Sequence, residues 1–170
     1  MFATLFKQKN TETQKQALDL YETALLNTRQ TVFYETYGVP DTFDGRFDLL
    51  LLHIFIQLQR MMGAQAYTEI SQALFDRTFQ DMDQTLREMG IGDMGVPKHM
   101  KRMMNAFNGR MHSYQDALND DTKMAEALSR NLYGTLEETQ IDQNKVSNMI
   151  NFVNRNIDKS INDNFENMVE

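Results

Sequence analysis

The chain has 170 residues, a net charge of −7 and no cysteine, and 41% of its residues are hydrophobic. The negative charge argues against general nucleic-acid binding and against a DNA partner, because phosphate neutralisation needs many lysines and arginines. Without cysteine the chain can form no disulfide and carry out no thiolate chemistry. No apolar stretch reaches the roughly 20 residues that a membrane-spanning helix needs.

Apolar residues recur at helical spacing along the chain and predict about six helices with no strand. The first is a long helix that ends at Gly38 and Pro40, and its inner face is expected to consist of Leu18, Tyr21, Leu25, Thr28 and Val32. The later helices are expected at about 43–62, 65–89, 96–118, 122–136 and 143–168. We therefore predict an all-α fold, a single-domain bundle over residues 1–170 with an amphipathic C-terminal helix at about 143–168.

The second predicted helix is apolar nearly all round from Leu49 to Ile56. Such a helix is buried on every side, so we expect it in the middle of the bundle. Thr42 or Asp44 can cap its start with a side-chain oxygen. Further along, Asn119–Asp121 predicts a turn and a cap, followed by a helix whose inner face is expected to carry Met124, Leu128, Leu132 and Leu136.

A glycine-rich reversal separates the third predicted helix from the fourth. Gly90 or Gly92 is expected to take a left-handed conformation there, because glycine lacks the Cβ that opposes it. Asp93 within the loop is expected to bond locally, and Pro97 suits the first turn of the next helix. We assign a structural role in the loop to Gly90, Gly92, Asp93, Gly95 and Pro97.

The two arms of this helical hairpin carry opposite charge. Asp76–Asp93 has five acidic residues against two arginines, whereas Met94–Gln115 has no acidic residue and four basic ones. We call Lys98, Lys101, Arg102 and Arg110 the basic stripe and predict that it contacts a partner. The alternative is that these cations are only a solvated face of the helix.

Thirteen methionines are an unusual number for a chain of this length. Methionine is flexible and polarisable, so it suits surfaces that accept varied apolar partners. We assign Met103, Phe107 and Met111 to the core. As candidates for a partner-binding groove we name Met94, Met100 and Met104.

Three separated blocks carry a resemblance to a known family: PDTFDGRFDLLLLH (Pro40–His53), LFDRTFQDMDQTLREMGIGDMGVPKHMKRM (Leu74–Met103) and AFNGRMHSYQDAL (Ala106–Leu118). Residues from about Tyr34 to Leu132 resemble the ubiquinol–cytochrome c chaperone family. Residues 1–29 and 133–170 show no such resemblance. The resemblance implies a chaperone that assists assembly of respiratory complex III by binding newly made cytochrome b, and it implies no catalytic residues.

Catalysis, a metal site and a cofactor are not expected. His53, His99 and His112 do not converge at ligand spacing, and His53 is better explained as a core histidine that bonds to a neighbour such as Asp48 or to a buried water. The acidic residues of the hairpin are expected to be solvated or bonded to loop N–H groups, with Asp83 paired to Arg87 four residues on.

We therefore expect a non-catalytic assembly chaperone that binds cytochrome b, or another apolar membrane-protein segment, through the methionines and the basic stripe. Its further partners could be another assembly factor, the ribosome or an anionic membrane surface. Two alternatives stay open: a membrane-surface adaptor that docks by Phe2–Phe6 and the basic stripe, and a bundle that binds a small apolar ligand near His53 and Asp48. The expected location is the cytoplasmic face of a bacterial inner membrane or the mitochondrial matrix.

Overall fold

A computed structural model describes the fold of residues 2–158 and their side chains from residue 11 onward. Seven α-helices and one short 3₁₀ helix make up this part of the chain, and none of its residues is in a strand. The helices are α1 Phe2–Thr28, α2 Val32–Glu35, α3 Phe43–Arg60, α4 Tyr67–Glu88, α5 Val96–Asp116, α6 Asp121–Asn131 and α7 Gln143–Ile157, with the 3₁₀ helix at Glu138–Gln140. The all-α prediction is confirmed, with one short helix more than expected.

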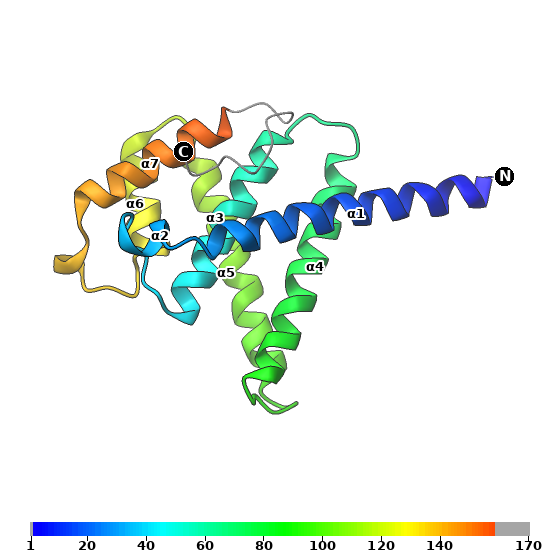
Figure 1. Cartoon of the computed structure of the whole chain (residues 1–170), viewed down its shortest axis with the longest axis horizontal. Helices are drawn as coiled ribbons and strands as arrows, with labels where there is room; N and C mark the ends of the chain where they lie inside the picture. Colours follow the sequence, from blue (N-terminus) through cyan, green and yellow to red (C-terminus); the bar gives the residue numbers. More distant parts are fainter. Residues whose placement is uncertain (1, 159–170) are drawn as a thin grey trace.

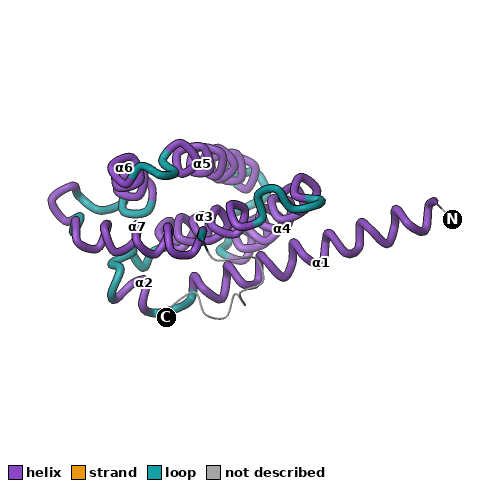
Figure 2. Tube along the Cα trace, turned by 90° about the horizontal axis from the view of Figure 1, so that it is seen from above, coloured by secondary structure: helices purple, strands orange, loops and turns teal. Residues whose placement is uncertain are grey.

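Helix α3 lies in the centre, as its apolar sequence predicted. It contacts α1, α5 and α7, and every side chain from Phe47 to Gln57 is buried. Figure 2 shows α5 and α6 on one side of α3 and α7, with α1 and α2 on the other. A helix that is apolar all round must bury its whole circumference, and this layered arrangement lets it do so.

Two hydrophobic clusters pack against opposite faces of α3. The first cluster joins α2, α6, α7 and the C-terminal half of α5, and includes Phe33, Leu52, Phe55, Tyr114 and Phe152. The second joins α1, α4 and the N-terminal half of α5, and includes Tyr21, Leu51, Phe79, Met82 and Met103. Helix α5 therefore belongs to both clusters, one at each of its ends.

Side-chain caps fix the starts of α3, α6 and α7, the last through Asp142, which accepts from the Asn144 N–H. The Thr42 side chain accepts a hydrogen bond from the Gly45 N–H at 3.1 Å, so Thr42 and not Asp44 caps α3. Asp120 accepts from the Lys123 N–H at the start of α6, directly after Asn119 with its positive φ of 63°. Each cap satisfies an N–H group that has no partner within its own helix.

Several details differ from the sequence-based expectation. Helix α1 ends at Thr28, and its buried face follows Ala17, Leu20, Tyr21 and Ala24, so Leu18 is turned outward and is 36% exposed. Helix α6 ends at Asn131, so Leu132 and Leu136 lie beyond it. The last helix was expected at about 143–168, and the part of it beyond residue 158 lies outside the described residues.

Candidate partner-binding surfaces

Helices α4 and α5 form a hairpin that projects from the rest of the molecule (Figure 1). Gly90 has φ +83°, its N–H donates to the Arg87 carbonyl, and the Ile91 N–H donates to the Leu86 carbonyl at 3.1 Å. This is a Schellman motif, which satisfies two carbonyls at the end of α4. The left-handed glycine of the loop is thus Gly90.

Of the other two glycines in the loop, Gly95 has no room for a larger residue, whereas Gly92 does. Gly92 lacks a positive φ, and a Cβ added there would meet nothing within 4 Å. A Cβ on Gly95 would lie 2.9 Å from the Ile91 side chain, so the loop closes tightly where α5 begins. Pro97 lies in the first turn of α5, as predicted, where its missing N–H leaves no hydrogen bond unmade.

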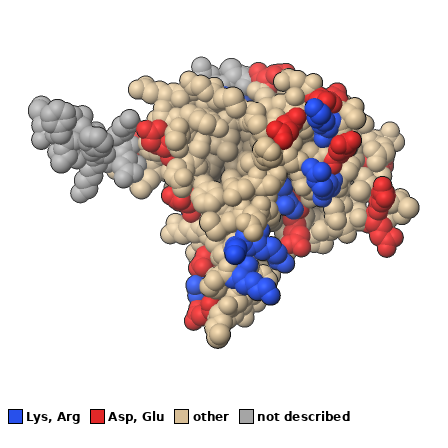
Figure 3. Space-filling view, turned by 180° about the vertical axis from the view of Figure 1, so that it is seen from behind, with Lys and Arg blue, Asp and Glu red and all other residues tan. Residues whose placement is uncertain are grey.

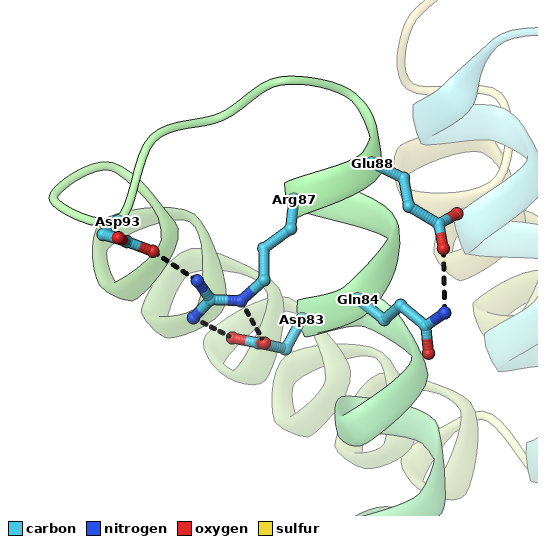
Figure 4. A network of polar contacts seen from close by, with 5 residues as sticks. All are labelled: Asp83, Gln84, Arg87, Glu88 and Asp93. Atoms are coloured by element: carbon cyan, nitrogen blue, oxygen red, sulfur yellow. Dashed lines mark hydrogen bonds and ion pairs between the residues drawn. The ribbon is translucent and has the colours of Figure 1, made fainter.

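Arg87 ties the loop to the end of α4. Its guanidinium binds the Asp83 carboxylate, with Nε to Oδ2 at 2.7 Å, and also binds the Asp93 carboxylate (Figure 4). The predicted Asp83–Arg87 pair is confirmed, and Asp93 bonds locally through this side chain. These groups are exposed, so the ion pairs contribute little to stability, but they neutralise carboxylates beside the loop.

Asp81 has a different role from the expected one. Its carboxylate accepts a hydrogen bond from the Tyr21 hydroxyl at 2.6 Å and lies 3.6 Å from the Arg77 guanidinium. Burial, and then this contact with Asp81, raises the pKa of Tyr21 far above its ordinary value. The expectation that Asp81 is solvated or bonded to the loop was wrong, because Asp81 joins α4 to α1 instead.

The groove candidates differ in their exposure. Met94 at the hairpin loop is 97% exposed and Met104 on α5 is 38% exposed, whereas Met100 is half-buried against the second cluster. Met103 and Phe107 are buried, as assigned from the sequence. Met89, directly after the end of α4, is 56% exposed.

The basic stripe divides into two parts. Lys98, Lys101 and Arg102 are exposed, and no carboxylate among residues 2–158 forms an ion pair with them. Arg110 instead points into the molecule, with its Nε 2.5 Å from Oδ1 of Asp48, a carboxylate whose side chain is 5% exposed. Figure 3, which views the molecule from behind, shows basic side chains gathered on its projecting lower part.

Asp48 lies on α3, so its pair with Arg110 connects the central helix to α5. Burial raises the pKa of Asp48, although the Arg110 guanidinium acts in the opposite direction. Arg110 therefore has a partner within its own chain, which separates it from the rest of the predicted stripe.

An open cleft of about 310 Å³ lies between the first turns of α3, the middle of α5 and the end of α6. Its lining residues are Asp44, Phe47, Asp48, Arg102, Met103, Ala106, Arg110, Arg130, Asn131, Gly134 and Thr135. Three arginines converge here from two helices. Sequence reasoning missed Arg130, and the only signal for it was a basic side chain in the last turn of α6.

His53 is enclosed in the first cluster, and it does not border the cleft. The rings of Phe33 and Phe152 meet its imidazole edge to face at centroid distances of 4.9 and 5.8 Å. Burial lowers the pKa of His53 to about 3. Its ring nitrogens have no hydrogen-bond partner within the described part of the chain, so the expected bond to Asp48 was wrong: that carboxylate faces Arg110.

Within the described residues, no three His, Cys, Asp or Glu side chains group in a way that could hold a metal ion. In the same range, no helix has the length and apolar character to cross a membrane.

A family model described as "Ubiquinol-cytochrome C chaperone" matches residues 35–161. "Protein CBP3, mitochondrial" of Saccharomyces cerevisiae is 31% identical over 119 residues, which cover 67% of this chain and 36% of the yeast protein. The "Ubiquinol-cytochrome-c reductase complex assembly factor 1" of Xenopus laevis is 25% identical over 143 residues, or 83% of this chain and 70% of the frog protein. The chain thus spans about a third of the yeast relative's length.

The fold is also similar to a solved structure. The crystal structure of the Cbp3 homolog from Brucella abortus matches with a TM-score of 0.74 and 37% sequence identity, over 95% of this chain and 91% of that one. The family match extends to residue 161, well beyond the Leu132 limit expected from the sequence blocks. Helix α7 therefore lies within the family region, and the expectation that residues after 132 match nothing was wrong.

Proposed function

This chain belongs to the ubiquinol–cytochrome c chaperone family, and we propose that it assists assembly of respiratory complex III by holding newly made cytochrome b at the tip of the α4–α5 hairpin. The frog relative is named an assembly factor of the ubiquinol–cytochrome c reductase complex, which supports the assembly role. The client and the surface that binds it are our inference from the residues at the tip.

The exposure of Met94 carries this proposal. A methionine that is 97% exposed at the end of a projecting hairpin is unfavourable in water, and Met89 and Met104 add further exposed apolar area. Flexible methionines can pack against varied apolar side chains, as a chaperone of membrane segments requires. Lys98 and Lys101, on the first turns of α5, can contact polar or acidic groups that flank such a segment.

The proposed action is non-catalytic, since a chaperone works by covering apolar surface until its client is assembled. Of the hairpin carboxylates, Asp81, Asp83 and Asp93 are engaged by Arg77 and Arg87, and Glu88 accepts a hydrogen bond from Gln84. We propose that the chain acts where cytochrome b is made, at the cytoplasmic face of a bacterial inner membrane or in the mitochondrial matrix. A second assembly factor, the ribosome or an anionic membrane surface would be a further contact of Lys98 and Lys101.

Site-specific photocrosslinking tests the client and the surface together. A photoreactive side chain is introduced at Met94 or Met104 in cells that are assembling complex III. Met62 provides the matched control, because it is also an exposed methionine (54%) but precedes α4, at the end opposite the hairpin loop. We expect crosslinks to cytochrome b from Met94 and Met104 and few from Met62. Equal yields at all three positions would rule out the hairpin tip as the client site.

A further inference from the structure

The cleft between α3, α5 and α6 offers a second recognition surface that the client proposal does not use. Arg102 and Arg130 both line it and are exposed, and neither forms an ion pair with a carboxylate among residues 2–158. Arg130 donates one hydrogen bond to the Ser113 hydroxyl at 2.7 Å. A guanidinium has five N–H donors, so both side chains retain donors for a ligand.

The third arginine of the cleft is fixed in place. Arg110 is held by the buried Asp48 carboxylate, so it forms part of the wall and contributes little net charge. Asp44 adds a negative charge at the rim. The cleft is thus only weakly positive, which suits singly charged carboxylates better than a doubly charged phosphate.

Part of the cleft lining is apolar. Phe47 and Met103, which are 7% and 3% exposed, line it together with the half-buried Ala106. A bare anion would leave this apolar surface unused, whereas a peptide can bring a carboxylate and an apolar side chain at once. A volume of about 310 Å³ has room for a few side chains.

We propose that this cleft binds a short acidic segment of a partner protein, in which Asp or Glu side chains alternate with apolar ones. The carboxylates would pair with Arg102 and Arg130 in bidentate fashion, and an apolar side chain would pack on Phe47, Met103 and Ala106. A nucleic acid or an anionic membrane fits the same surface poorly, because the chain as a whole carries a charge of −7. This proposal goes beyond the client site at the hairpin tip and does not depend on it.

Selection from a library of displayed random peptides tests the proposal on the full chain. We expect the enriched peptides to carry Asp or Glu next to apolar residues. Synthetic copies of them should bind the Arg102→Gln/Arg130→Gln variant at least about tenfold more weakly than the parent, because two charge-assisted contacts are lost. The matched control is Lys98→Gln/Lys101→Gln, which also removes two positive charges from the surface but outside the cleft, and it should retain binding within about threefold.

A second variant tests the cleft without changing its charge. Ala106→Leu should weaken binding of the same peptides by filling the apolar part of the cleft, and circular dichroism checks that each variant remains helical. A library that yields no acidic peptides, or equal losses in the two double variants, overturns the proposal. It is also overturned if inorganic phosphate or phosphatidylglycerol vesicles displace the peptides and bind with the same dependence on Arg102 and Arg130, because the cleft would then be a phosphate site. Loss of client crosslinking at Met94 in a variant that keeps peptide binding would affect only the chaperone proposal.

Discussion

The two ends of α5 carry the same kinds of side chain in opposite environments. At the hairpin end, Lys98 and Lys101 are exposed beside Met94. At the other end, Arg110 is paired with a buried carboxylate and Tyr114 is fully buried in the first cluster. A cation on a helix is therefore a candidate for partner binding only where its own chain leaves it exposed and unpaired.

Packing explains the difference between the two ends. Helices α3 and α6 both contact α5, and α3 supplies Asp48 to Arg110. Among the described residues, α5 has only α4 beside it at the hairpin tip (Figure 1), and the carboxylates of Asp81, Asp83 and Asp93 are engaged by Tyr21, Arg77 and Arg87. Glu88, also on α4, accepts a hydrogen bond from Gln84, so none of these four carboxylates forms an ion pair with Lys98, Lys101 or Arg102.

The largest effect should come from the buried end. Arg110→Gln removes the partner of Asp48 and leaves a buried carboxylate unpaired, which typically costs about 3–5 kcal/mol. We expect the free energy of unfolding, measured by urea denaturation, to fall by roughly this amount. The double variant Asp48→Asn/Arg110→Gln should recover much of the loss, because no buried charge is left. If the single variant is as stable as the parent, the contrast between the two ends of α5 does not hold.

His53 provides a pH-dependent test of the same buried region. Its pKa is about 3 in the folded chain against 6.5 when exposed, so the unfolded chain binds a proton that the folded chain does not. The stability that the neutral His53 side chain contributes is fully present above pH 6.5 and is lost as the pH falls toward 3. Between pH 7 and pH 5 the loss should be about 2 kcal/mol.

The control for this effect is His53→Leu, which removes the titrating group and keeps the site apolar. Urea denaturation of both proteins at several pH values isolates the contribution of His53, since the other titrating groups are shared. We expect the stability of the variant to vary less between pH 7 and pH 5. Parallel curves for the two proteins would mean that the imidazole takes up its proton in the folded state.

At the exposed end the backbone is the sensitive feature. Gly90→Val forces a β-branched residue into a left-handed conformation and should cost about 1–2 kcal/mol. Gly92→Val is the matched control, since Gly92 has no positive φ and a Cβ there meets no atom within 4 Å. We expect the melting temperature to fall for Gly90→Val and to stay near that of the parent for Gly92→Val. Similar shifts in both would indicate that valine itself, and not the conformation of Gly90, disturbs the loop.

The sequence predicted what depends on local chemistry and missed what depends on the approach of distant segments. Helical spacing identified the central helix, and a glycine at a helix end identified the left-handed turn at Gly90 or Gly92. The choice between those glycines depends on where α4 stops. The pairing of Arg110 with Asp48 joins residues 62 positions apart, and the approach of Arg130 to Arg102 joins two different helices. No pattern within one helix contains that information.

The smallest effect on stability, and the most informative for function, is expected from the exposed cations. Lys98→Gln/Lys101→Gln/Arg102→Gln removes three positive charges that have no ion-pair partner among the described residues, and glutamine is about as good a helix former. The free energy of unfolding should therefore hardly change.

Crosslinking from Met94 to the client should weaken in this triple variant if these cations contact the client, and the crosslinking that remains should respond less to salt, because fewer screened charge contacts are left. The matched control is Lys123→Gln/Lys145→Gln/Arg155→Gln, which removes three positive charges from helices α6 and α7 outside the cleft. Since those charges lie away from the hairpin tip, the control should crosslink at Met94 like the parent. If the triple variant at the tip also crosslinks and supports complex III assembly like the parent, Lys98, Lys101 and Arg102 are a solvated face, and the exposed methionines alone would have to account for client binding.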